Sequence, residues 1–401
     1  MKFSFKISRT EEARDRRLSY VIAWMLMGLF LTNVAAIGGE VLVITAEMMS
    51  LINKVILLFL IILNLNTLCN RIKENQIFYI LGMLTLFVIN YLIFANEREY
   101  QIVLIFTYFV TILPVVVILS CIRDYQILLD IMVKMSVAIL ILSGMCLLID
   151  STIGADYTYS MGYANSLIIP ICCMIYLYFE KRKFIFVILA IIGGLNILIL
   201  GSRGALLAIG VYFITQLMKR INSLENRNRV LVLFMLIIFC LIFFRPILSL
   251  IEFILAQNGF SSRTIELLLN DFMHSSGRGI IYEAIKQEIK LQPFVIRGIG
   301  GEYHVTGGFY AHNFILEILC DFGVIVGGIL LIIVLIGIIR TLTLKEDNGK
   351  CSVTTLFFSC AIPILLISES IWQYVYFWLW GTMIVSIALK ERRTPRSIRR
   401  D

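Results

Sequence analysis

The stretch "FYAHNFILEILCDFGVIVGG", Phe309 to Gly328, is apolar over most of its length, as a helix in lipid is. It begins, however, with a polar pair, His312 and Asn313, and it also carries Glu317 and Asp321. Carboxylates at membrane depth are rare and usually functional. The sequence therefore predicts a membrane helix that opens with a histidine and contributes to a functional site.

The composition of the whole chain agrees with a membrane protein. Of its 401 residues, 59% are hydrophobic and 15% are charged, and the mean hydropathy is +0.90. A soluble domain is about 45–50% apolar. Apolar runs of roughly 18 residues or more recur along the chain and predict spanning helices. We therefore expect an all-α, polytopic integral membrane protein rather than the several soluble domains that its length would allow.

We expect about twelve spans, because the basic ends predict that both termini are cytoplasmic and an even number returns the chain to the same side. No cleavable signal peptide is visible, so the first helix, from Leu18, is expected to remain. The expected spans are 18–37, 51–68, 76–95, 101–121, 127–149, 164–180, 184–200, 203–218, 229–250, 313–338, 354–371 and 374–389. The resulting division is a basic tail at 1–17, spans one to nine at 18–250, a large outer loop at 251–312, spans ten to twelve at 313–389 and a second basic tail at 390–401.

The loop at 251–312 is too long to lack structure unless it has a function. Its first amphipathic stretch has Ser261 as a candidate cap, and its second repeats isoleucines at four-residue spacing. We expect both to be short helices on the membrane surface. The apolar faces consist of Ile265, Leu268, Leu269 and Phe272 in the first and Ile281, Ile285 and Ile289 in the second.

Metal and nucleic-acid partners are not indicated. None of the nine cysteines has metal-ligand spacing, and they do not form a disulfide framework. A zinc site from His274, His304 and Glu302 is an alternative, although their spacing matches no ligand motif. The basic tails are explained by the positive-inside rule, so we expect no nucleic-acid partner.

Two arginines have surroundings that suit a phosphate group. Arg203 is flanked by Gly201 and Gly204 and precedes a predicted helix, whose free N–H groups favour anions. Arg278 also has glycines on both sides and a predicted helix after it. A guanidinium fork binds phosphate well, so the two arginines could clamp a diphosphate. The alternative for Arg203 is a snorkelling side chain at a helix end.

His312 is expected to start span ten, where the helix N-terminus disfavours a cationic imidazole. Gly323 and Gly327 form a small-xxx-small pair that would let another helix pack closely on the same face. A neutral histidine held in this way can act as a general base. The alternative is a histidine without a catalytic role, whose ring nitrogens simply form hydrogen bonds at the membrane interface. Glu317 and Asp321 could hold an arginine, be protonated, or supply a second base.

These motifs resemble those of the O-antigen ligase and polymerase superfamily of bacterial surface-polysaccharide assembly. The shared patterns are an arginine and a leucine four residues on (Arg203 and Leu207) and a histidine and a glycine eleven residues on (His312 and Gly323). A large outer loop precedes the second pattern, as in that family. Further similar segments are "GYANS", "SGRGIIYEAIKQEI" and "GIGGE". The resemblance covers roughly residues 150–330.

The resemblance implies a GT-C-like membrane glycosyltransferase that inverts the anomeric centre and uses neither a metal ion nor another cofactor. Its donor would be a polyprenyl-diphosphate-linked glycan, such as an undecaprenyl diphosphate derivative, and its acceptor a sugar hydroxyl. Arg203 and Arg278, with Arg297 as a third contact, would bind the diphosphate, and His312 would deprotonate the acceptor. The protein would lie in the bacterial cytoplasmic (inner) membrane with its site on the outer face, and a chain-length regulator and a flippase are its expected partners.

Three functions remain open from the sequence. We favour a repeat-unit polymerase for O-antigen, capsule or exopolysaccharide over a ligase that transfers glycan to lipid A core or protein. A flippase for lipid-linked oligosaccharides is the alternative from another class, but its charges would line a cavity through many spans. Here the unusual charges gather at one face and one loop. A Walker loop is not visible, and energy would come with the donor.

Overall fold

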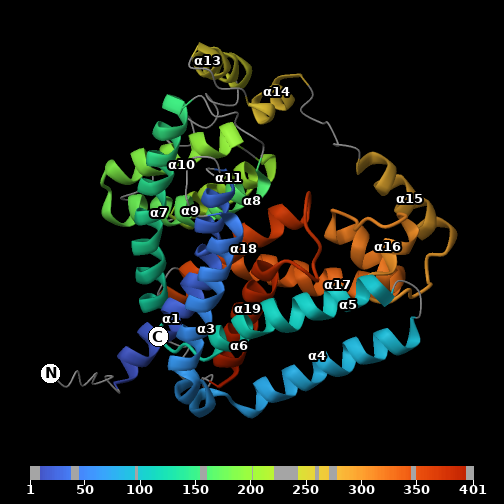
Figure 1. The fold of residues 1–401 in the computed structure, drawn as a ribbon. Coiled ribbons are helices and arrows are strands. Elements are labelled where there is room, and N and C mark those ends of the chain that lie inside the picture. Colours follow the sequence, from blue (N-terminus) through green and yellow to red (C-terminus); the bar gives the residue numbers. More distant parts are fainter. Residues whose placement is uncertain are drawn as a thin grey trace.

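The structure, a computed structural model, describes residues 10–37, 45–94, 98–153, 160–200, 202–220, 243–257, 262–270, 278–344 and 349–393. Within these ranges the chain is helical and contains no strand, which confirms the all-α prediction (Figure 1). The helices before residue 154 are α1 (Glu11–Met27), α2 (Leu29–Ile37), α3 (Ala46–Arg71), α4 (Glu74–Ile93), α5 (Arg98–Thr107), the π-helical turn η1 (Tyr108–Ile112), α6 (Leu113–Ser120) and α7 (Tyr125–Ile153). Those after it are α8 (Met161–Ser166), α9 (Ile168–Lys181), α10 (Ile185–Leu200), α11 (Arg203–Arg220), α13 (Phe244–Gln257), α14 (Arg263–Asn270), α15 (Arg278–Leu291), α16 (Gly301–Val305), α17 (Phe314–Thr343), α18 (Gly349–Leu365) and α19 (Val375–Arg393).

Seven helical stretches in the described residues are long and apolar enough to cross a membrane. They are Glu11–Ala36, Ala46–Arg71, Glu74–Ile93, Arg98–Ser120, Tyr125–Cys146, Met161–Lys181 and Phe314–Thr343. Three shorter apolar helices, α10, α18 and α19, coincide with other expected spans, and α11 coincides with 203–218. Most of the expected span at 229–250 lies outside the described residues, and α13 continues past 250 to Gln257. The number twelve therefore stays a prediction.

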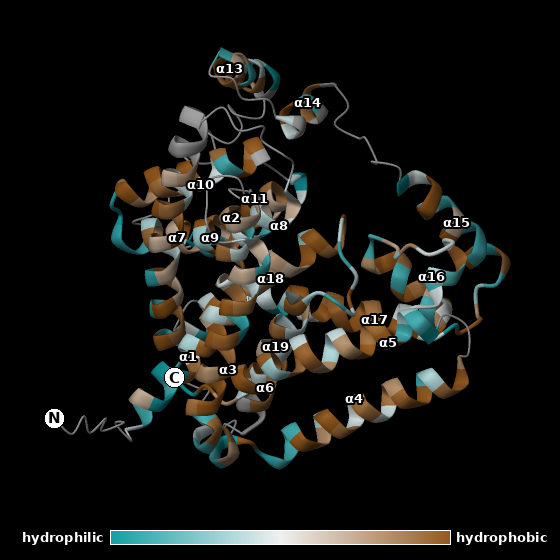
Figure 2. Cartoon of the chain, in the orientation of Figure 1, coloured by the Kyte–Doolittle hydropathy of each residue, from teal (hydrophilic) through white to brown (hydrophobic). Residues whose placement is uncertain are grey.

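Helix α4 shows how the apolar surface is distributed. It is apolar along its length (Figure 2), and large side chains such as Phe78 and Leu92 are 70% and 68% exposed. Exposed apolar side chains on this scale would be unfavourable in water and are suited to contact with lipid tails. A helix of this length also matches the roughly 30 Å of a bilayer core.

Helix α18 lies at the centre of the molecule. Every residue from Ser352 to Leu365 is buried, and the helix packs against α7, α9, α11 and α19. A helix that is buried on all sides must be surrounded by other helices. Its C-terminal end at Leu365 is therefore held from several directions, and this rigidity extends to the connection that leads into α19.

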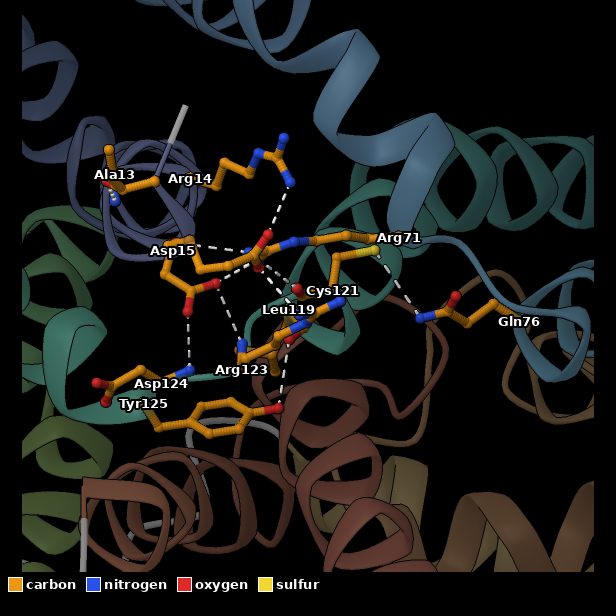
Figure 3. A network of polar contacts seen from close by, with 12 residues as sticks. Ala13, Arg14, Asp15, Arg71, Gln76, Leu119, Cys121, Arg123, Asp124 and Tyr125 are labelled. Carbon is orange, nitrogen blue, oxygen red and sulfur yellow. Dashed lines mark hydrogen bonds and ion pairs between the residues drawn. The ribbon is translucent and has the colours of Figure 1, made fainter. Parts of the chain in front are cut away.

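A buried ion pair joins the first helix to the rest of the bundle (Figure 3). The carboxylate of Asp15 in α1 bonds to the guanidinium of Arg71 at the end of α3, and both side chains are only 4% exposed. Asp15 also accepts the backbone N–H groups of Arg123 and Asp124, at 3.3 and 3.1 Å. Arg71 donates to the carbonyl of Cys121 at 3.0 Å. These bonds fix α1, α3 and the turn between α6 and α7 to one another.

The two amphipathic helices of the large loop are present, but their apolar faces pack on protein. The predicted face of α14 packs on α10 and α13, and that of α15 packs on α16 and α17. Ile265 and Ile285 are fully buried within the chain, so these residues contact protein instead of lipid, and the position of the two helices at the membrane surface stays a prediction. The described cap of α14 is Ser262, whose Oγ accepts the N–H of Ile265 at 3.2 Å. Ser261 and Phe272 lie outside the described residues.

Gly323 breaks α17 instead of providing a packing face for another helix. Its backbone has φ 69° and ψ 170°, which an L-residue rarely adopts. A Cβ there would lie 3.1 Å from the carbonyl oxygen of Val295, and a Cβ on Gly327 would lie 2.8 Å from that of Ile318. The two halves of α17 thus fold against each other. The prediction of a continuous helix with a small-xxx-small face for another helix is wrong, because the backbone turns at the first of these glycines.

Candidate functional site

The candidate site forms around the short connection between α18 and α19, residues 366–374. Three consecutive carbonyl groups of this connection accept hydrogen bonds from residues that the sequence singled out. Leu366 accepts from Asn313 at 3.1 Å, Ile367 accepts from the Arg278 guanidinium, and Ser368 accepts from His312 Nδ1 at 3.1 Å. One segment of backbone therefore brings together side chains from α15 and from the start of α17.

His312 lies just before α17 rather than in its first turn. The helix begins at Phe314, and the side chain of Asn313 caps it by accepting the N–H groups of Ile315 and Leu316 at 3.0 and 3.2 Å. His312 itself has φ 53°, a strained conformation for a residue other than glycine. The expectation that His312 starts the helix is thus wrong by two residues, and the backbone turn there aims its ring at the connection instead.

The hydrogen bond to Ser368 determines the state of the imidazole. A carbonyl only accepts, so Nδ1 must carry the proton and Nε2 keeps its lone pair. Burial lowers the pKa of His312, Arg278 lowers it further, and the Ser368 carbonyl opposes this shift. The ring is therefore neutral at neutral pH. Tyr310 lies against it, with ring centroids 3.9 Å apart. A neutral ring with a free Nε2 lone pair is the form that a general base needs.

Arg278 is the first residue of α15 and is half-buried. Its guanidinium donates to the Ile367 carbonyl, and its positive charge acts on the side chains of His312, Tyr310 and Glu369. The structure thus brings Arg278 and His312 to adjacent residues of the same connection. A guanidinium with further N–H groups at a helix N-terminus is suited to an anion.

Arg203 is the first residue of α11, as predicted. A Cβ on the neighbouring Gly204 would lie 3.3 Å from Cδ1 of Ile367 and 3.1 Å from Cδ1 of Ile364. The start of α11 therefore packs on the residue whose carbonyl binds Arg278. Both arginine-bearing helix N-termini meet at Ile367. Gly201 and Gly277, the other predicted flanking glycines, lie outside the described residues.

Arg297 and Leu207 have different surroundings. The Arg297 guanidinium pairs with Glu288 at 2.6 Å and donates to the carbonyl of Cys320 at 3.3 Å. These bonds join the end of α15 to α17, and a diphosphate would have to compete with them. Leu207 is 45% exposed on α11.

Glu317 is fully buried and holds the connection in place. Its two oxygens accept the hydroxyl of Ser370 at 2.5 Å and the N–H of Ile371 at 3.1 Å. Both bonds lie within three residues of Ser368, which binds His312. With its oxygens occupied in this way, Glu317 is suited to positioning the connection and not to removing a proton from a substrate.

Asp321 is also fully buried and organises the "GIGGE" segment. Its carboxylate accepts the N–H groups of Gly300 and Glu302, each at 3.2 Å, and the Trp372 indole at 3.4 Å. Its backbone carbonyl accepts two further N–H groups, from Arg297 and Gly298. Such bonds are available because the helix breaks at Gly323. Asp321 therefore ties the loop, α17 and the connection together.

The zinc alternative has little support in the described residues, where no group of three or more His, Cys, Asp or Glu side chains could hold a metal ion. His304 is exposed, whereas the neighbouring Glu302 is fully buried. Burial raises the pKa of Glu302 well above its usual range, and the nearby Asp321 and Glu317 raise it further. His274 lies outside the described residues.

Sequence reasoning missed the connection itself. Ile367 and Ser368 contribute through backbone carbonyls, which carry no sequence signal, and Ser370 acts on a residue far away in the chain. The available signal was the polar "SES" between two apolar helices, Ser368 to Ser370.

A comparison with protein-family models, curated proteins and solved structures finds no match for the chain.

Proposed function

We propose that this protein is a membrane glycosyltransferase that transfers a polyprenyl-diphosphate-linked oligosaccharide to a sugar hydroxyl. The observation that supports this proposal is the meeting of Arg278 and His312 on the adjacent carbonyls of Ile367 and Ser368. It provides a fixed cation for a leaving diphosphate next to a neutral base for an incoming hydroxyl. The GT-C-like architecture and the position at the outer face of a bacterial inner membrane are part of the proposal.

In the proposed reaction, the acceptor oxygen attacks the anomeric carbon of the donor sugar. The bond from that carbon to the phosphate oxygen breaks, and the diphosphate leaves with the electron pair. Nε2 of His312 takes the acceptor proton as the new carbon–oxygen bond forms. Attack opposite to the leaving group inverts the anomeric configuration.

The two arginines act on the charge that develops on the diphosphate. Fixed cations at this position stabilise the transition state without a reorganisation of solvent. Arg278 bonds to the residue next to the one that binds the base, and Arg203 begins α11, whose start packs on Ile367. The helix N-termini that carry them add partial positive charge. Because the donor is already activated, positioning and electrostatics are sufficient, and a nucleotide is not required.

In-vitro transfer from a purified lipid-linked oligosaccharide, with the protein in liposomes, tests the proposal. We expect glycan transfer with release of polyprenyl diphosphate, and we expect EDTA to leave the rate unchanged. Failure to bind or turn over any lipid-linked oligosaccharide would contradict the proposal. Loss of activity with EDTA and its recovery with zinc would support the metal alternative instead.

The acceptor distinguishes the polymerase, which we favour, from the ligase. A polymerase elongates one lipid-linked repeat unit with another, so a single lipid-linked substrate should yield a ladder of products. A ligase would give product only when lipid A core or a protein acceptor is added. Transport of the intact lipid-linked substrate across liposomes, without cleavage of the glycosyl–phosphate bond, would indicate the flippase.

A further inference from the structure

One carboxylate in the connection has no role in the arrangement described above. Glu369 lies between Ser368, whose carbonyl accepts from His312, and Ser370, whose hydroxyl donates to Glu317. Both neighbours are held by hydrogen bonds, so the backbone at Glu369 is fixed. The side chain is half-buried, and among the described residues its carboxylate has neither a hydrogen-bond partner nor an ion-pair partner.

A cation and a phenol group lie near the carboxylate of Glu369. Arg278 and Tyr310 are both close enough to act on it electrostatically, yet Arg278 does not come within ion-pair distance in the described structure. Burial raises the pKa of Glu369 to about 7, and the positive charge of Arg278 opposes that rise. A half-buried carboxylate without a partner is costly, so a ligand that donates a hydrogen bond would stabilise it.

We propose that Glu369 binds a hydroxyl group of the donor sugar next to the diphosphate, in the space between its carboxylate and Arg278. The inference rests on the proposed function and assigns the sugar-recognising residue of the same site. A carboxylate repels a diphosphate but accepts hydrogen bonds from sugar hydroxyls. Arg278 would bind the phosphate side of the glycosyl–phosphate bond, and Glu369 would bind the sugar side.

The other buried carboxyl groups nearby are less suited to this task. Glu317 already accepts from Ser370 and Ile371, and Asp321 already accepts from two backbone N–H groups and an indole. Glu302 is fully buried, so neither of its carboxylate oxygens is accessible to a ligand. Glu369 alone among these four residues combines partial exposure with unused acceptor oxygens. Tyr310, whose ring is tilted against that of His312, adds an aromatic surface on which a sugar could rest.

The test compares sugar recognition with diphosphate binding. Glu369→Ala and Glu369→Gln are assayed for transfer from the lipid-linked donor and for inhibition by sugar-free polyprenyl diphosphate. We expect Glu369→Ala to lower kcat/KM for the donor by about tenfold or more, the scale of a hydrogen bond to a charged group. Inhibition by the sugar-free diphosphate should not weaken, because the carboxylate repels this ligand and makes no bond to it. Glu283→Ala, an exposed carboxylate on α15, serves as the control and should be fully active.

A series of monodeoxy donors identifies the hydroxyl. The wild type should lose about tenfold on one of them, whereas Glu369→Ala should lose nothing further on the same donor, because the two changes remove one interaction. Normal transfer by both Glu369 variants would overturn this inference and leave the proposed function intact. The same tenfold loss on that monodeoxy donor in Glu369→Ala as in the wild type would also overturn it, since Glu369 would then act only as a counter-charge to Arg278. An inactive wild type would overturn both proposals.

Discussion

Nδ1 of His312 lies 3.1 Å from the backbone carbonyl of Ser368, and this single contact fixes which nitrogen of the ring is available for chemistry. The acceptor is a main-chain atom, so it cannot titrate or be exchanged by a side-chain substitution. The backbone turn at His312 directs its ring toward Ser368, and the buried end of α18 precedes the connection that carries the Ser368 carbonyl. The predictions below follow from this arrangement and from the contacts around it.

Removal of the imidazole should abolish transfer and preserve the fold. His312→Asn is the sharpest variant, because asparagine tolerates the positive φ of this position and lacks a basic nitrogen. We expect transfer to fall by about 10²-fold or more, since general-base catalysis contributes 10²–10⁴-fold. Binding of polyprenyl diphosphate should remain. The exposed His304→Ala is the control, and near-normal transfer by His312→Asn would remove this histidine from the mechanism.

The pH dependence of transfer should report the lowered pKa of His312. Burial lowers that pKa below the ordinary value of 6.5, so the neutral form persists to lower pH. The rate should therefore be more than half-maximal at pH 6.5 and should fall as the pH drops through the lowered pKa. A pH–rate profile for kcat/KM in liposomes measures this. A half-maximal rate above pH 6.5 would contradict the neutral-base assignment.

Arg203→Lys and Arg278→Lys should each reduce transfer by about tenfold or more. Lysine keeps the charge but loses the fork, and a charge-assisted hydrogen bond is worth roughly 1.5–3 kcal/mol. The loss should appear in the binding of polyprenyl diphosphate, measured by fluorescence or competition. Arg98→Lys, at an exposed arginine over the ring of Tyr91, is the matched control. Normal binding and transfer in both site variants would exclude the clamp.

Glu317→Ala and Ser370→Ala should lower kcat through the position of the connection. Each removes the hydrogen bond between the Glu317 carboxylate and the Ser370 hydroxyl, so each should cost about tenfold. Because they remove the same interaction, the double variant should be little slower than either single variant. Fully additive losses would show that the two residues act independently and that the contact does not position the site.

Asp15→Asn should destabilise the folded protein. It removes the buried carboxylate and leaves Arg71 with only the half-exposed Glu11, at 2.6 Å, as an ion-pair partner; removal of one partner from a buried pair costs about 3–5 kcal/mol. The thermal unfolding midpoint in detergent should drop clearly. Glu12→Gln breaks the exposed pair with Arg16 and should change the free energy of unfolding by less than about 1 kcal/mol. Equal midpoints for the two variants would contradict the structural role of Asp15.

The sequence predicted those parts of the fold that depend on local composition. Spanning helices are recognisable because hydropathy is a property of a short segment, and the ranges of α3, α4 and α9 lie close to the predicted ones. The helices α14 and α15 were also recognisable from their apolar periodicity. The partner of an apolar face is not encoded locally, and for this reason Ile285 was expected to lie on lipid although it packs on α17.

The candidate site could be predicted only in part. Arg203, Arg278 and His312 were found because their surroundings are unusual; the structure brings Arg278 and His312 to one connection and packs the start of α11 beside it. The role of Gly323 was misread, because a glycine spacing shows neither the φ angle nor the direction of the chain. The roles of Ile367 and Ser368 could not be predicted, since any residue supplies a backbone carbonyl. Contacts between residues this far apart in the chain can be identified only once the three-dimensional fold is known.

The break at Gly323 also determines which part of α17 responds to the bilayer. Beyond the break, residues 324–343 form about 20 helical residues, or roughly 30 Å, which is enough to cross the hydrocarbon layer without the first half. A thicker or thinner membrane can then be accommodated by tilting of this second half alone. The first half, with Glu317 and Asp321, stays bonded to the loop and the connection. The geometry around His312 should consequently be insensitive to lipid chain length.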